Sequence, residues 1–141
     1  MRILTFINNY LPGYKYGGPV RSLAKLTDLT SRNTNVIFDI ITHNKDFKEK
    51  KPYNNIMPRK WYYNNGANVL YIRNVVKDLF FLIKTIRKRS FESYYFQSAF
   101  SPNFTLFFFF FIKFFFFLQI NIIISSRGEF FSVAIDIKGR K

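Results

Sequence analysis

RILTFINNYLPGYKYGGPVRSLAKLTDL, residues 2–29, decides the fold expected of this 141-residue chain. Residues 2–8 are mostly apolar and predict a buried strand. Residues 8–19 are rich in Gly, Pro and Asn and predict a loop. From Val20 onwards apolar residues recur at helical spacing, and Pro19 suits the first turn of that helix because its missing N–H needs no partner there. The stretch therefore predicts a strand, a glycine loop and a helix in succession.

The glycine loop is a candidate site for an anion. Backbone N–H groups at a helix N-terminus have no partner in the helix, and they attract phosphates. Gly17 and Gly18 allow positive φ and the close approach of a ligand to the backbone. Arg21, one turn into the helix, can add a charge-assisted contact. From the spacing alone, a phosphate site and a plain connection are equally good interpretations.

The rest of the chain alternates in the same way. Further strands are expected at residues 36–42, 68–72, 93–97 and 119–125, and further helices at 75–89 and 102–118. Residues 56–68 receive no regular element. Strands that alternate with helices, across connections too long for hairpins, indicate a parallel sheet. We therefore expect one α/β domain over residues 1–141, with a Rossmann-like parallel sheet flanked by helices.

In such a sheet, ligands bind outside the carboxyl ends of the strands. Three segments are expected at that edge: the Gly17–Gly18 loop, the loop after Gln97, and residues 125–129. Arg127 and Glu129 could bind a polar ligand there. The alternative is a turn with a solvated ion pair, which composition alone favours.

Composition excludes several kinds of chemistry. The chain has no cysteine and a single histidine, His43, so neither a thiolate site nor a histidine-based metal cluster or Ser-His relay is expected. No cofactor is expected. His43 is expected in a solvated loop, and Asp39, inside a strand, as a hydrogen-bonded structural residue. The net charge of +14 favours polyanionic partners, either nucleic acid or an anionic membrane.

The Phe-rich stretch, residues 104–118, allows two interpretations. With residues 119–124 it reaches about 20 residues, the length of a membrane span. Lys113 near its middle would cost about 2.5–3.5 kcal/mol in a bilayer, which the phenylalanines could offset. Ser101-Pro102 as a start signal and residues 119–121 as a break favour instead a buried helix followed by a buried strand.

A basic cluster at the end of the second expected helix predicts peripheral association with an anionic membrane. The cluster consists of Lys84, Arg87, Lys88 and Arg89. Each cation could contribute about 1 kcal/mol near an anionic surface. A solvated helix end explains the same residues equally well.

Two motifs carry a resemblance to a known family. GYKYGGPVRS at residues 13–22 and SRGEF at residues 126–130 resemble the amino-terminal domain of group 4 glycosyltransferases, two-domain enzymes of the GT-B fold. The strand exits at residues 40–46 and 94–102 are similar at the level of pattern. The resemblance implies transfer of a sugar, with retention, from a nucleotide-sugar donor to a glycan or lipid-linked acceptor in cell-surface polysaccharide synthesis.

The resemblance also implies which residues bind substrate and where the protein works. Gly17, Gly18, Arg21, Arg127 and Glu129 would face the cleft between the two domains. The carboxyl-terminal domain would supply most contacts to the donor, so residues 1–141 are expected to hold only half of a site and to lack useful activity alone. The implied location is the cytoplasm, including the inner face of the membrane.

Three other classes of protein share some of these features. A dinucleotide-binding dehydrogenase shares the topology, but the loop lacks G-x-G-x-x-G spacing and no acidic residue closes the second strand. A nucleic-acid-binding module fits the charge, but the aromatic residues lie in apolar runs that core packing explains, so no nucleic-acid partner is expected. A small membrane-associated protein with a Phe-rich span is the third.

Overall fold

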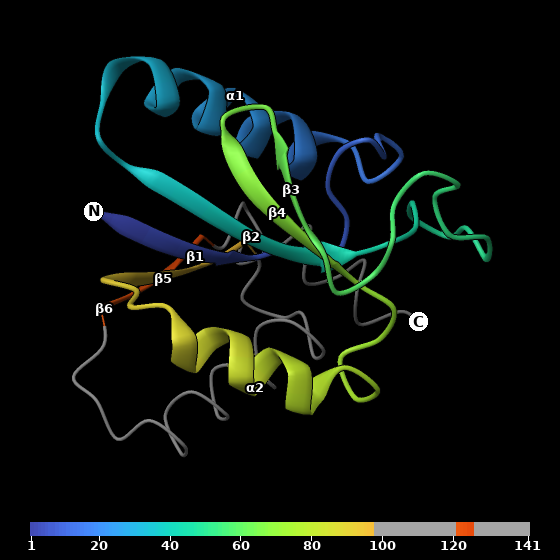
Figure 1. Ribbon diagram of the computed structural model, residues 1–141. Coiled ribbons are helices and arrows are strands. Elements are labelled where there is room, and N and C mark those ends of the chain that lie inside the picture. Colours follow the sequence, from blue (N-terminus) through green and yellow to red (C-terminus); the bar gives the residue numbers. More distant parts are fainter. Residues whose placement is uncertain (98–120, 126–141) are drawn as a thin grey trace, which may run out of the picture.

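The computed structural model describes residues 1–97 and 121–125. In these residues two helices lie on opposite faces of a six-stranded sheet (Figure 1). The elements in chain order are β1 (Arg2–Phe6), α1 (Gly18–Asn33), β2 (Ile37–His43), β3 (Trp61–Asn64), β4 (Ala67–Ile72), α2 (Leu79–Lys88), β5 (Ser93–Phe96) and β6 (Asn121–Ile124). The architecture is an α/β fold compatible with a Rossmann-like arrangement, as the alternation of elements predicted.

The sheet has the strand order β3-β4-β2-β1-β5-β6. Every neighbouring pair is parallel except β3 and β4. In register, Leu4 of β1 lies opposite Asp39 of β2 on one side and Tyr94 of β5 on the other. All five strands expected from the sequence are present, and their mutual pairings are parallel as predicted.

The sixth strand corrects the prediction for residues 56–68. Trp61–Asn64 forms β3, which pairs antiparallel with β4 through a two-residue turn. Asn65 and Gly66 have φ values of 49° and 76°, and positive φ at both central residues is the geometry of a tight hairpin turn. A Cβ at Gly66 would lie 2.5 Å from the Thr27 carbonyl oxygen, so only glycine lets this turn pack against α1.

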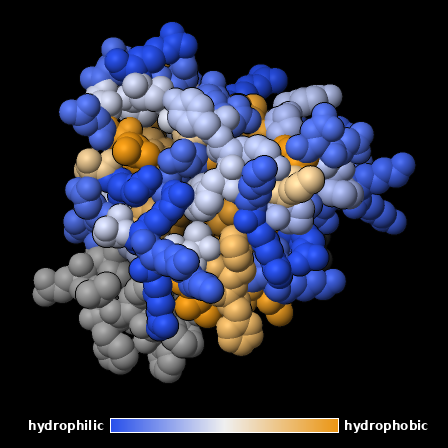
Figure 2. Space-filling view, in the orientation of Figure 1, coloured by the Kyte–Doolittle hydropathy of each residue, from blue (hydrophilic) through white to orange (hydrophobic). Residues whose placement is uncertain are grey.

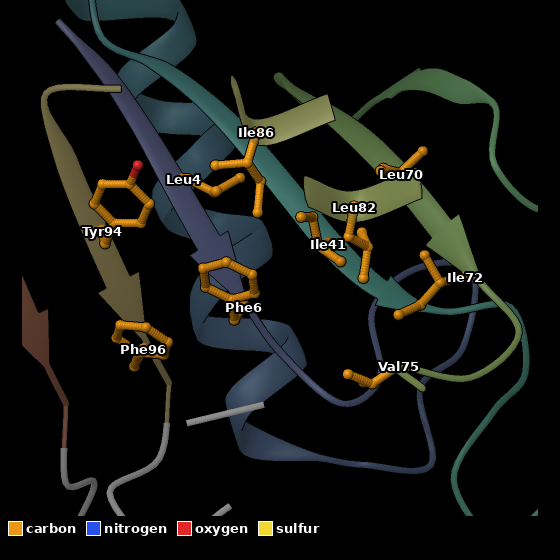
Figure 3. Packing of buried hydrophobic residues seen from close by; sticks show 10 residues of the cluster. All are labelled: Leu4, Phe6, Ile41, Leu70, Ile72, Val75, Leu82, Ile86, Tyr94 and Phe96. Atoms are coloured by element: carbon orange, nitrogen blue, oxygen red, sulfur yellow. The ribbon is translucent and has the colours of Figure 1, made fainter. Parts of the chain in front are cut away.

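The apolar residues of the strands divide into two core layers, because successive residues of a strand point to opposite faces. The layer under α1 consists of Ile3, Ile7, Tyr10, Val20, Leu23, Phe38, Ile40, Ala67, Val69 and Tyr71. The layer under α2 consists of Leu4, Phe6, Ile41, Leu70, Ile72, Val75, Leu82, Ile86, Tyr94 and Phe96 (Figure 3). Phe6 and Phe96 stack there with ring centroids 5.1 Å apart. Burial on both faces explains the continuous apolar runs of β1, β2 and β4.

Helix α2 begins later than the predicted residue 75, because Asp78 organises the preceding turn. The buried Asp78 carboxylate accepts a hydrogen bond from the backbone N–H of Arg73 at 2.8 Å. It also pairs with the Arg59 guanidinium, whose Nη2 lies 2.6 Å away. Burial alone would raise the pKa of Asp78, but the Arg73 N–H and Arg59 outweigh burial and lower it.

Asp39 is a structural residue, as expected. It binds Arg89, which therefore does not belong to the exposed basic cluster that the sequence predicted. The fully buried Asp39 carboxylate accepts hydrogen bonds from Asn68 at 2.7 Å and from Arg89 at 2.8 Å. The Arg2 Nε lies 3.1 Å from the same carboxylate. Arg89 also stacks on Trp61, 4.1 Å from the ring centroid. The charge of Arg89 is therefore committed to the fold rather than to a surface.

The Phe-rich stretch, residues 104–118, lies outside the described residues, and so does the helix expected at 102–118. Residues 121–124 form β6, which is parallel to β5, so these four belong to the sheet and not to a helical span. In the ranges 1–97 and 121–125, neither helix has the length and apolar character needed to cross a bilayer.

Candidate functional site

The sheet changes its winding direction between β1 and β5. The connection through α1 leads from β1 to β2, on one side of β1. The connection through α2 leads from β4 across to β5, on the other side of β1. In open α/β sheets, ligands bind at such a switch point, outside the carboxyl ends of the two strands. The glycine loop after β1 and Gln97 after β5 both lie at this edge.

The glycine loop leads into α1, whose uncapped N-terminus lies at this edge. Gly17 has φ 76° and ψ −130°, a conformation that favours glycine, and it precedes α1 without any side-chain cap. The first turn of α1 contains no acidic residue. Gly18 is already helical, and a Cβ placed on it would meet no atom within 4 Å. Only Gly17 therefore needs positive φ, whereas Gly18 leaves open space against the backbone.

Asp46, from the loop after β2, holds the glycine loop in place. Its buried carboxylate accepts hydrogen bonds from the backbone N–H groups of Tyr14 at 3.2 Å and Lys15 at 3.4 Å. It also accepts one from the N–H of Phe47 at 2.7 Å. Lys15 forms an ion pair with Glu49 in the same neighbouring loop. The two loops are thereby fixed to each other, a link that sequence reasoning missed.

Two tyrosine hydroxyl groups anchor the start of the glycine loop. The Tyr71 hydroxyl donates to the Leu11 carbonyl, and the Tyr53 hydroxyl donates to the Tyr10 carbonyl at 3.4 Å. Burial, as the largest cause, raises the pKa of Tyr71 to about 12, so its hydroxyl keeps its proton at neutral pH and can donate. The Tyr10 hydroxyl in turn shares a hydrogen bond of 3.0 Å with Thr27 of α1. The loop is thus positioned by buried contacts before any ligand arrives.

A hollow of about 430 Å³ lies beside the anchored loop. Its lining residues are Asn8, Asn9, Tyr16, His43, Lys45, Asp46, Phe47, Lys48, Glu49 and Lys50. The two carboxylates of this set are engaged by the loop contacts described above, and the Asn9 side-chain amide donates to the Lys45 carbonyl at 2.8 Å. The lining as a whole combines lysine, amide and aromatic side chains. Lysines attract negative charge, amides hydrogen-bond hydroxyl groups, and an aromatic ring packs against a flat apolar face. The hollow suits a hydroxyl-rich anionic ligand.

The sequence predicted His43 in a solvated loop, and this prediction is wrong. His43 is the last residue of β2 and lines the hollow. Burial lowers the pKa of His43 to about 4, and the positive charge of Lys45 lowers it further in the same direction. A hydrogen bond with the Ile72 backbone raises it by less. The imidazole is therefore neutral at pH 7 and presents an uncharged polar ring to the hollow.

Gln97 places a buried amide at the switch point. Its backbone N–H donates to the Phe6 carbonyl at 3.4 Å, which sets the residue beside the end of β1. The side chain is only 4% exposed. Neither its Oε1 nor its Nε2 has a hydrogen-bond partner among the residues that the structure describes. Since a buried amide without a partner costs free energy, this one is a group that a ligand could satisfy.

The structure brings together part of the predicted site. Gly17, Gly18 and Arg21 all lie at the carboxyl edge, with Arg21 exposed on α1, while Tyr16 from the same loop lines the hollow. The N–H of Ser125 donates to the Phe96 carbonyl at 2.9 Å, so the exit of β6 is at this edge as well. The predicted site residues Arg127 and Glu129 lie outside the described residues.

A second hollow of similar volume lies at the opposite, amino edge of the sheet. It is lined by Ser31, Thr34, Asn35, Val36, Ile37, Tyr63, Gly66 and Asn68. None of these side chains carries a charge, and both helices that the structure describes begin at the other edge of the sheet. The carboxyl edge is therefore the better candidate. In the described ranges no group of three His, Asp or Glu side chains is arranged to hold a metal ion.

These features define an α/β protein with an uncapped helix N-terminus and a lysine-lined hollow at the switch point of its sheet. Comparison with protein-family models, with curated proteins and with solved structures found no match.

Proposed function

We propose that this chain is the acceptor-side domain of a retaining glycosyltransferase of the GT-B type. It would take part in the transfer of a sugar from a nucleotide-sugar donor to a glycan or lipid-linked acceptor, in cell-surface polysaccharide synthesis at the cytoplasmic side of the membrane. The donor would be bound mainly by a second domain. The residues proposed to contact substrate are Gly17, Gly18 and Arg21, with Arg127 and Glu129 assigned by the resemblance alone.

The observation that carries the proposal is the open space at Gly18, at the mouth of an anchored loop and an uncapped helix. A diphosphate placed there would meet N–H groups of the first turn of α1 and the positive end of the helix dipole. The neighbouring lysine-lined hollow would receive the acceptor, whose hydroxyl groups could hydrogen-bond polar groups of the lining. The two subsites lie side by side, as transfer between two substrates requires.

Residues 1–141 alone are expected to bind a nucleoside diphosphate weakly and to give no turnover. In GT-B enzymes the site is built between two domains, and the resemblance assigns the main donor contacts to the second one. The assay is release of UDP or GDP from a panel of nucleotide sugars, with and without a carboxyl-terminal domain of a group 4 enzyme supplied by fusion. Clear turnover by residues 1–141 alone would contradict the division of labour proposed here.

Gly18→Ala is expected to weaken binding of UDP by at least about tenfold without harming the fold. The added methyl group meets no protein atom, so the free energy of unfolding should stay the same or rise by up to about 1 kcal/mol. A phosphate held against the backbone would instead be pushed away, with loss of a charge-assisted hydrogen bond worth about 1.5–3 kcal/mol. Amide chemical shifts of Gly17, Val20 and Arg21 and of residue 18 during titration with UDP measure the affinity.

A second test variant and its matched control lie on the same helix. Arg21→Gln should weaken UDP binding several-fold, whereas Lys25→Gln, one turn further from the N-terminus, should change it less than twofold because the field of the helix end falls off within the first turn. If Gly18→Ala binds UDP as well as the parent chain, the helix N-terminus is not the diphosphate site.

A further inference from the structure

Helix α2 carries a large apolar side chain on its solvent face. Leu82 and Ile86 are buried against the sheet, which leaves Phe80 on the outside, 87% exposed. Val76, in the turn before the helix, is 73% exposed. In Figure 2, apolar side chains come to the surface over α2 between strongly hydrophilic ones. Singly exposed apolar residues are ordinary on a protein surface, so Phe80 and Val76 indicate an interaction surface only together with the charges around them.

The charges around Phe80 indicate which kind of partner this surface would bind. Every charged residue between positions 57 and 91 is a lysine or an arginine except Asp78. Asp78 is buried and already paired with Arg59 and Arg73, so it offers no negative charge to the outside. Lys77, Lys84 and Lys88 are exposed on or beside α2. The surface is therefore apolar at one point and cationic around it.

We propose that α2 binds the surface of an anionic membrane, with Phe80 and Val76 entering the headgroup region and Lys77, Lys84 and Lys88 on the lipid phosphates. A helix with phenylalanine between lysines has the composition of helices that lie in the interface plane. The lysine stems can lie along the apolar surface while their ammonium groups reach the phosphates. This surface differs from the cluster predicted from the sequence. Arg89 is withdrawn into the fold, Arg87 is not part of the proposed set, and Val76, Lys77 and Phe80 are added.

The binding mode fixes the position of the candidate site relative to the bilayer. Phe80 lies in the first turn of α2, which follows directly on the turn at the carboxyl end of β4. The end of α2 that carries Phe80 and Val76 is therefore at the same edge of the sheet as the glycine loop. If the proposed sugar transfer holds, a lipid-linked acceptor would be presented to that edge from the membrane, a consequence that rests on the proposed function, whereas the membrane binding itself does not.

Sedimentation with lipid vesicles tests the proposal on the full chain. Binding to vesicles with 30% phosphatidylglycerol should exceed binding to pure phosphatidylcholine vesicles and should weaken with salt. Phe80→Ala should weaken it about tenfold, from the lost burial of one phenylalanine. Lys84→Gln with Lys88→Gln should weaken it about 30-fold, at about 1 kcal/mol for each cation. Unchanged thermal unfolding of the variants shows that these exposed positions leave the fold intact.

The matched control lies on α1, on the opposite face of the sheet. Lys25→Gln with Leu29→Ala removes a cation and an exposed apolar side chain of similar kind, and binding should change less than twofold. Equal loss in this control would overturn the proposal, because binding would then follow net charge alone. Binding to neutral vesicles as strong as to anionic ones would also overturn it, and so would indifference to vesicles combined with binding of a duplex oligonucleotide through Phe80 and Lys84.

Discussion

Replacing Asp39 by alanine is expected to lower the free energy of unfolding by about 3–5 kcal/mol. Asp39 is fully buried between β1 and β4, and its carboxylate is the shared partner of Arg2, Arg89 and the Asn68 amide. Removal would leave two partly buried guanidinium groups and one amide without the acceptor around which they are packed. Domains of this size have a total stability of about 5–15 kcal/mol, so the loss would be a large part of the whole.

Urea denaturation followed by circular dichroism measures this change. The control is Asp28→Ala on α1, which breaks an exposed ion pair with Arg32 at 2.8 Å and should cost less than about 1 kcal/mol. Arg89→Met with Asp39→Asn, measured singly and together, gives the coupling between the two partners. A loss below 1 kcal/mol for Asp39→Ala would mean that water replaces the carboxylate and that the pair is not important for stability.

The centre of the sheet was predictable because β1, β2 and β4 are buried on both faces. Such strands read as continuous apolar runs. The shorter apolar runs of β5 and β6 were recognised as well, although β6 is mostly exposed. The edge strand β3 was not, since a segment with Pro58, three consecutive aromatic residues and a glycine looks irregular. A signal was present nevertheless: Asn65-Gly66 is the commonest dipeptide of a two-residue hairpin turn, and it adjoins an apolar run.

The candidate site was predictable only where it is local. The glycine loop and the start of α1 are adjacent in sequence, so the positions of Gly17, Gly18 and Arg21 followed from one stretch. Asp46 binds that loop from more than 30 residues away, and nothing in its neighbourhood distinguishes it from the charged residues beside it. Its role comes from the parallel pairing of β1 with β2, which sets the two exits side by side.

His43 shows how the same rule could have been taken further. Residues that directly follow a buried parallel strand lie at the carboxyl edge, where ligands bind. His43 is the last residue of β2 and Gln97 directly follows β5, and these positions mark both residues as candidates. The polarity of His43 led instead to the prediction of a solvated position. That prediction failed because the burial of a side chain depends on the loops that pack over it and not on its own type.

The stability of the fold is expected to fall by about 2–3 kcal/mol between pH 7 and pH 4 on account of His43 alone. Burial, then the charge of Lys45, lowers the pKa of His43 from 6.5 to about 4 in the folded chain. Below pH 6.5 the unfolded chain therefore takes up a proton that the folded chain does not take up until pH approaches 4. The unfolded state binds more protons in this window, so its stabilisation grows as the pH falls, and the folded state is most stable above pH 6.5.

Urea denaturation at pH 7.0, 5.5 and 4.5 measures the effect, with His43→Gln as the comparison. His43 is the sole histidine, so the window between about pH 6.5 and 5 contains no other side chain of that intrinsic pKa. The depressed pKa of Asp78 affects stability only at lower pH, below its ordinary value of 3.8, and is common to both proteins. His43→Gln should flatten the upper part of the pH profile and leave the steep loss at low pH in place. Two results would contradict this prediction: equal stability of the parent chain at pH 7.0 and 5.5, or an imidazole that titrates near pH 6.5 by NMR. Either result would show that the His43 ring is solvated and not buried beside the hollow.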